Sequence, residues 1–144
     1  MRLGTGLMMF FVGLAFSVRA AQPDFTVTDY CDLSLKASQV AELEWKDRIL
    51  LAQSHQGTSK SLDIKLKALE THHSQLRDQL YARYGTTFHD FLRYGASHQT
   101  AIRLYLEQNP SVKSALGDAS TRVQSERQQM ESLMAAKHFS EVRK

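Results

Sequence analysis

The amino-acid sequence predicts an all-α protein, an antiparallel helical bundle or two helical hairpins made of about four helices. Pro23 and Pro110 bracket a long stretch without proline that is rich in Leu, Gln, Glu, Lys, Arg and Ala, the residues that favour helix. Within it, apolar residues recur at alternating steps of three and four, the spacing of one helix face. A length of 144 residues with 42% hydrophobic residues suits one folded domain and excludes a disordered chain.

Residues 1–20 are expected to be a secretory signal peptide. Arg2 precedes an apolar run from Leu7 to Phe16, and cleavage is expected after Ala20 or Ala21. The run is shorter than the ~20 residues of a membrane-spanning helix, so no stable membrane anchor is expected after cleavage. The expected location is therefore periplasmic or secreted.

Cleavage also changes the charge. It removes Arg2 and Arg19 but no acidic residue, so the net charge falls from +3 to +1. A nearly neutral chain is not expected to bind nucleic acid. The single cysteine, Cys31, excludes an internal disulfide, and it is either a small buried residue or a thiol able to pair between chains.

The mature chain is expected to have an extended or mobile N-terminal segment at 21–35 and a single helical domain at 36–140. A first helix is predicted at 36–55, ending before Gly57, where the following hydroxyl residues can cap the next helix. A second helix at 59–84 has the clearest seam, with one histidine among leucines. Its seam residues are Leu62, Leu66, Leu69, His73, Leu76 and Leu80.

A third helix is predicted at 87–107, opened by a capping box of Thr87 and Asp90. Gly95 leaves two alternatives, one continuous helix or two short helices with Ser97 capping the second. A fourth helix, starting at Asn109 and Pro110 and ending near residue 138, shows the same seven-residue stepping. This stepping also suits a homodimer that shares its seams.

Two seam histidines and one glutamate form a speculative metal site. In an unbroken antiparallel hairpin, His73 and His98 would stand at one level on either side of the turn at Gly85, with Glu42 near that level on the first helix. Such a set could hold zinc or copper, and no other cofactor is expected. The alternative is that the histidines are hydrogen-bonded seam residues that set the register.

Aromatic and arginine side chains crowd around the turn between the second and third helices. Such mixtures are typical of protein-binding hot spots, and the alternative is that the rings close the end of the bundle. The candidate partner-binding residues are Tyr81, Arg83, Tyr84, Phe88, Phe91, Arg93 and Tyr94. An enzyme is not expected, because the sequence has no glycine-flanked serine elbow, phosphate-binding loop or His-Glu-x-x-His motif.

The segment Leu33-Ser34-Leu35-Lys36-Ala37-Ser38-Gln39 resembles the Leu-Thr-x-x-Gln signature of the Spy/CpxP-like family of periplasmic proteins. That resemblance implies a small, typically dimeric, all-helical protein with a cleaved signal, acting as a stress-induced chaperone or a metal-responsive accessory.

Three functions follow as hypotheses. The first is a non-catalytic exported protein of the bacterial envelope that binds protein partners or unfolded clients, as a chaperone or stress adaptor. The second is a metal-binding or small-ligand-binding module that uses the seam histidines. The third is a structural subunit of an envelope assembly.

Overall fold

The computed structural model describes residues 25–142, which form five helices. They are α1 (Val27–Ser54), α2 (Ser59–Arg83), α3 (Phe88–Ser97), α4 (Gln99–Gln108) and α5 (Pro110–Val142). The predicted all-α class is confirmed. The expected signal peptide at residues 1–20 lies outside the described residues. No helix in the described part of the chain is both long enough and apolar enough to span a membrane.

Helix α1 begins at Val27, so the expectation of an extended segment at 21–35 is wrong for residues 27–35. Its start is a capping box: the amide of Asp29 donates to Thr26 Oγ1 (3.2 Å), and the amide of Thr26 donates to the Asp29 carboxylate (2.9 Å). The extra turns bury Cys31 and Leu33, which are 1% and 0% exposed. The alternative of Cys31 as an exposed thiol is therefore wrong for this structure.

The other helix starts follow the sequence closely. Thr58 caps α2 by accepting from the amide of Ser61, and Thr87 caps α3 by accepting from the amide of Asp90. Between α2 and α3, Gly85 has φ 66°, a left-handed conformation that ends α2 and that glycine adopts without strain.

The predicted third helix is two short helices, α3 and α4. The break lies at His98 and not at Gly95, which remains inside α3. His98 caps the end of α3, because its amide donates to the carbonyl of Tyr94 (2.9 Å). Ser97, the expected cap of the second short helix, is the last residue of α3, and its hydroxyl donates to the carbonyls of Arg93 and Tyr94.

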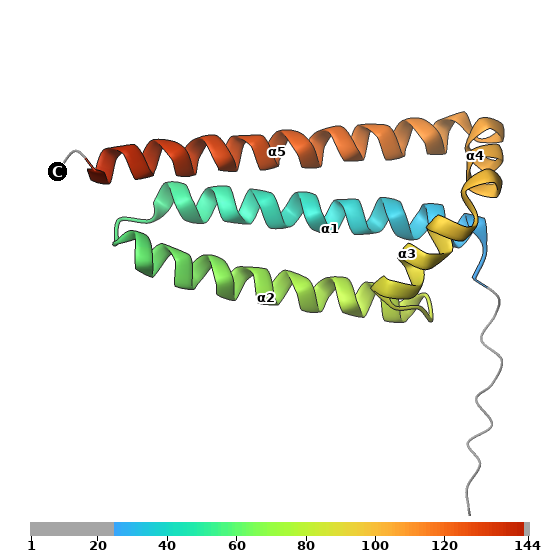
Figure 1. The fold of residues 1–144 in the computed structure, drawn as a ribbon, viewed down its shortest axis with the longest axis horizontal. Helices are drawn as coiled ribbons and strands as arrows, with labels where there is room; N and C mark the ends of the chain where they lie inside the picture. The colour runs from blue at the N-terminus through green and yellow to red at the C-terminus, as the bar shows by residue number, and fades with distance from the viewer. Residues whose placement is uncertain (1–24, 143–144) are drawn as a thin grey trace, which may run out of the picture.

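The three long helices lie side by side with α1 in the middle (Figure 1). Helix α1 lies close to both α2 and α5, whereas the backbones of α2 and α5 do not approach each other closely. The predicted antiparallel arrangement holds for α1 and α2. Helix α5 instead runs parallel to α1, because α3 and α4 cross one end of the layer and do not return along it (Figure 1). Two contacts between α1 and α5 agree with this parallel direction. Arg122 pairs with Glu42, and further along both helices Lys137 Nζ bonds to the His55 carbonyl.

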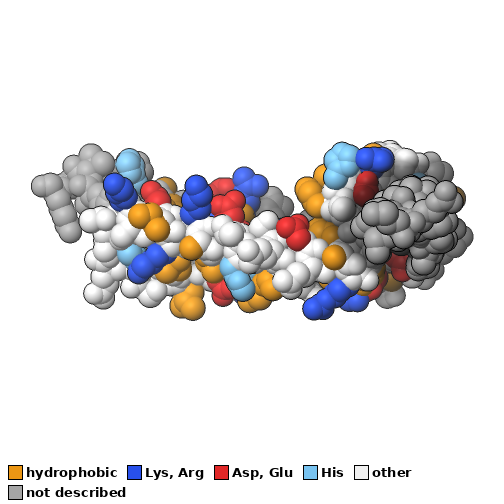
Figure 2. Space-filling model, turned by 90° about the horizontal axis from the view of Figure 1, so that it is seen from below, with side chains coloured by type: hydrophobic (Ala, Val, Ile, Leu, Met, Phe, Trp, Pro, Cys, Tyr) orange, Lys and Arg blue, Asp and Glu red, His pale blue; other side chains and the backbone are white. Residues whose placement is uncertain are grey.

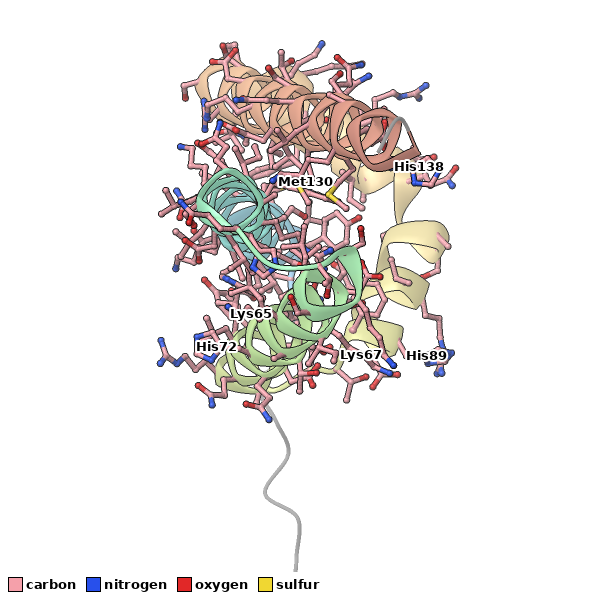
Figure 3. All side chains as sticks on the ribbon, turned by 90° about the vertical axis from the view of Figure 1, so that its left-hand side faces the viewer. Lys65, Lys67, His72, His89, Met130 and His138 are labelled. Carbon is pink, nitrogen blue, oxygen red and sulfur yellow. The ribbon has the colours of Figure 1, made fainter. Side chains whose placement is uncertain are left out.

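The apolar core has two parts. One, near the α1–α2 turn, consists of Ile49, Ala52, Leu62, Leu66 and Met130, with Trp45, Leu51, Leu133 and Met134 packed on it. The other, near α3, consists of Leu33, Tyr81 and Phe91, with Phe25, Tyr30, Ala37, Leu80 and Tyr84 packed on it. Met130 lies between α5 and the two other long helices (Figure 3).

Gly95 has ordinary helical backbone geometry, and its lack of a side chain leaves room for the ring of Tyr30. A Cβ at this position would lie 2.5 Å from the Tyr30 hydroxyl and 2.9 Å from the ring carbon that carries it. At Gly117, in α5, an added Cβ would meet nothing within 4 Å, so space is free there. The two glycines are therefore a matched pair, each inside a helix and differing in surroundings.

We expect Gly95→Ala to lower the free energy of unfolding, because Tyr30 must move and lose its stacking on Phe91. Gly117→Ala should raise it by about 0.5–1 kcal/mol, the usual gain of replacing glycine inside a helix. Urea unfolding followed by circular dichroism measures both. Equal stabilisation by the two variants would contradict the Tyr30 contact.

Candidate functional site

The aromatic residues predicted to bind a partner mostly form an internal joint. Tyr30 of α1 stacks on Phe91 of α3 with ring centroids 4.5 Å apart, and Tyr81 of α2 lies 5.3 Å from Phe91. Tyr81 and Phe91 are buried, and Tyr84 and Tyr94 are half-buried. These four rings fix α3 against α1 and α2. They therefore fit the second interpretation, in which the rings close the end of the bundle.

The remaining candidate residues of the turn are exposed. Phe88 is 53% exposed and contacts Tyr81, and Arg83 and Arg93 are also exposed. Arg93 is held by its own helix, through His89 Nδ1 and Asp90. Partner binding by these three residues stays a prediction.

The three candidate metal ligands do not meet. His73 is 1% exposed and its Nε2 bonds to Asp47 (2.9 Å), whereas His98 is exposed and stacks on Tyr94. Glu42 pairs with Lys46 and Arg122. Among the described residues, no group of three or more His, Cys, Asp or Glu side chains could hold a metal ion. The predicted site fails because α3 turns across the layer, which takes His98 away from α2.

The other histidines do not replace this site. His72, His89 and His138 lie on three different helices, with His72 on the opposite side of the molecule from His89 and His138 (Figure 3). On the part of the α2 face that Figure 2 shows, apolar side chains of the described residues are scattered among polar and charged ones.

Among the described residues, an open groove of about 700 Å³ lies on the face of α1 between α2 and α5. In a view along the layer, α1 is set back from the line that joins α5 and α2, and α3 and α4 lie on the opposite side (Figure 3). Tyr30 and Phe91 line the groove on the α3 side. The groove therefore lies where a further helix could pack beside α1.

The floor of the groove consists of small side chains at helical spacing. Ser34, Ala37, Ser38 and Ala41 all line it from α1. The serine hydroxyls donate to their own helix, Ser34 to the carbonyl of Tyr30 (2.6 Å) and Ser38 to the carbonyl of Ser34 (2.9 Å). The side chains of the floor are therefore short, and both serine hydroxyl protons are already donated to backbone carbonyls of α1.

The two walls each carry an arginine. On the α2 wall, Arg77 binds Glu44, which is 7% exposed and also accepts from Arg48 (2.7 Å). On the α5 wall, Arg127 pairs with Glu131 at 2.8 Å, and both side chains are about 60% exposed. Arg77 is thus held by a buried carboxylate, whereas the Arg127 pair is a surface pair of small net strength.

The groove was not among the predicted sites, although one signal for it exists in the sequence. Small residues at steps of three, one and three (Ser34, Ala37, Ser38, Ala41) mark a helix face without bulk. That signal gains meaning only when the neighbouring helices are known, because the same residues are common on exposed helix faces.

A second polar network joins the ends of α1 and α2. Tyr84 donates to the Asp32 carboxylate, and Lys36 Nζ contacts both Asp32 (2.8 Å) and the Tyr84 hydroxyl (2.6 Å). The hydrogen bonds from Lys36, and then Tyr84, hold the pKa of Asp32 below its usual range. In the same way Lys46, and then Arg122, lower the pKa of Glu42, which joins α1 to α5.

Comparison with known proteins gives no relative: no protein-family model, no curated protein and no solved structure matches this chain.

We expect His73→Leu to raise the free energy of unfolding by about 1 kcal/mol. His73 Nδ1 has no hydrogen-bond partner among the described residues, and a leucine of similar volume continues the α2 seam. Asp47, 40% exposed on its side chain, remains solvated after the change. Asp47→Asn is the control, because it removes the carboxylate that bonds to His73 Nε2 and leaves the histidine in place. A clear loss of stability in the leucine variant would show that the pair with Asp47 stabilises the fold.

Stability should fall on acidification. A carboxylate whose folded pKa is lowered stabilises the fold above its unfolded pKa of about 4, and this contribution is lost as pH falls through the folded value. Asp32 and Glu42 are such groups. Thermal unfolding of Asp32→Asn should show a lower Tm than the parent at pH 7 and a similar Tm near pH 2. A difference in Tm between the two proteins that stays constant from pH 7 to pH 2 would contradict a stabilising role for the Asp32 charge.

Proposed function

We propose that this chain is an exported, non-catalytic helical protein of the bacterial envelope that binds a segment of a protein partner or an unfolded client. The observation that carries the proposal is the groove over α1. Its volume of about 700 Å³ is within the usual range of binding sites, and its lining combines apolar, aromatic and polar side chains.

Two further features support binding without catalysis. Cys31 is 1% exposed, and burial raises the pKa of its thiol, which disfavours the nucleophilic thiolate. The histidines that could have formed a metal site are separated within the fold, His73 against Asp47 and His98 against Tyr94. The export part of the proposal rests on the signal-like pattern of residues 1–20.

The proposal is tested by filling the groove. Ala41→Trp places a large ring on the groove floor, and Ser120→Trp places one on the α5 wall, at a position exposed enough to spare the fold. Ala68→Trp, on an exposed position of α2 that does not line the groove, is the matched control. The measurement is suppression of aggregation of a chemically unfolded test protein at equimolar concentration.

We expect the parent chain and Ala68→Trp to suppress aggregation, and both groove variants to lose most of this effect while keeping their helical circular dichroism. Absence of suppression by the parent chain would contradict the proposal. Equal suppression by all four proteins would place client binding elsewhere on the surface.

A further inference from the structure

We propose that the groove accepts an amphipathic α-helix of the partner, which lies along α1 as the missing fourth helix of a bundle and pairs a carboxylate with Arg127. This inference rests on the proposed function and names the chemistry of the occupant. Three observations carry it: the shape of the floor, the hydrogen bonds already made there, and the charges on the walls.

The floor has the shape that a packed helix needs. The residues from Ser34 to Ala41 span about 10 Å of helix axis, and none of the four floor side chains is larger than serine. Small side chains at a contact let two helix axes approach to about 8 Å. An occupant helix can therefore place large apolar side chains against Ala37 and Ala41, between the walls formed by α2 and α5.

The position is that of a bundle helix. The backbones of α2 and α5 flank α1 without approaching each other closely, and the groove lies on the face of α1 between them. The chain does not fill this face itself, because α3 ends at Ser97 and α4 continues in another direction (Figure 1). The aromatic joint of Tyr30 and Phe91 borders the groove on the α3 side.

The floor favours a helix over an extended segment. An extended backbone needs hydrogen-bond partners along its whole length, whereas a helix satisfies its backbone internally. Ala37 and Ala41 offer no side-chain hydrogen bond, and the hydroxyl protons of Ser34 and Ser38 are donated to α1 carbonyls. The floor therefore supplies apolar contact and no side-chain donor.

The wall charges favour a carboxylate on the occupant. Arg77 and Arg127 line facing walls, and Glu131 is the one acidic residue of the lining. The Arg127–Glu131 pair is surface-exposed on both sides, so Arg127 can turn to a carboxylate of an incoming helix at little cost. Arg77, fixed by buried Glu44, keeps the α2 wall in place.

The test uses three synthetic peptides of about 18 residues, a length at which designed helices are stable enough to study. One is an amphipathic helix with a leucine face flanked by glutamates, the second has lysines in place of the glutamates, and the third is the glutamate peptide broken by two central prolines. Binding is measured by fluorescence anisotropy. The protein variants are Arg127→Glu and its matched control Arg103→Glu, which changes another exposed i,i+4 pair, outside the groove.

We expect the glutamate helix to bind the parent chain about five-fold more tightly than the lysine helix, and the proline peptide to bind least. Arg127→Glu should reverse the preference between glutamate and lysine helices, whereas Arg103→Glu should leave it unchanged. Ser120→Trp should abolish binding of both helices.

Each other outcome overturns the inference. Equal binding of the proline peptide, abolished by Ser120→Trp, would make the occupant an extended segment and leave the proposed function standing. Equal affinity of the parent chain for the glutamate and lysine helices would show that Arg127 does not select a carboxylate on the occupant. A parent chain that sediments as a dimer and becomes monomeric in Ser120→Trp would assign the groove to a second copy. Failure of every peptide together with failure to protect an unfolded client would overturn both proposals.

Discussion

The packing of α1 between two other helices is the constraint on which the rest of the structure depends. Helices α2 and α5 each lie close to α1, whereas their own backbones do not approach each other closely. Leu33 and Ala52, near the two ends of α1, are completely buried. A helix that packs on two sides buries a wider arc than an amphipathic surface helix does, and its charged residues must then find partners inside the layer. Glu44 shows this consequence, because it is buried and held by Arg48 and Arg77.

The aromatic joint around Phe91 decides the direction of the chain after α2. Tyr30 and Tyr81 hold Phe91 from two helices, and the lack of a side chain on Gly95 lets Tyr30 approach α3 closely. With α3 fixed across the end of the layer, α4 reaches α5 on the same end, so α5 starts beside the N-terminal part of α1 (Figure 1). The parallel direction of α1 and α5 and the open groove both follow from this one joint.

Polar contacts distinguish the two sides of α1. Towards α2 they include the pair of His73 with Asp47, the contact of Arg77 with Glu44 and the network of Tyr84, Asp32 and Lys36. Towards α5 they include the pair of exposed Arg122 with half-buried Glu42. The bonds of Glu44 and His73 are the buried ones among these contacts, and replacing buried pairs by apolar residues often leaves stability unchanged or higher.

The helical class, the seams of the second and last helices, and the helix starts at Thr58, Thr87 and Pro110 follow from the sequence alone. They depend on periodicity, on the two threonine caps and on a proline at the first position of α5. The sequence also contains the capping box at Thr26 and Asp29, but periodicity does not point to a helix start there, because the first turn has no clear apolar seam. Tertiary structure alone decided what these elements form together. His98 would lie beside His73 only in a straight, unbroken hairpin, and the chain breaks at His98 instead.

The roles of Tyr81 and Phe91 depended on whether Tyr30 packed against them, and nothing local to any one of these segments sets that distance. The groove has the same origin: its floor is encoded in one helix, but its walls come from helices separated by long stretches of chain. Local patterns specify where helices begin, end and turn their apolar faces, whereas the space between helices is set by contacts between distant residues.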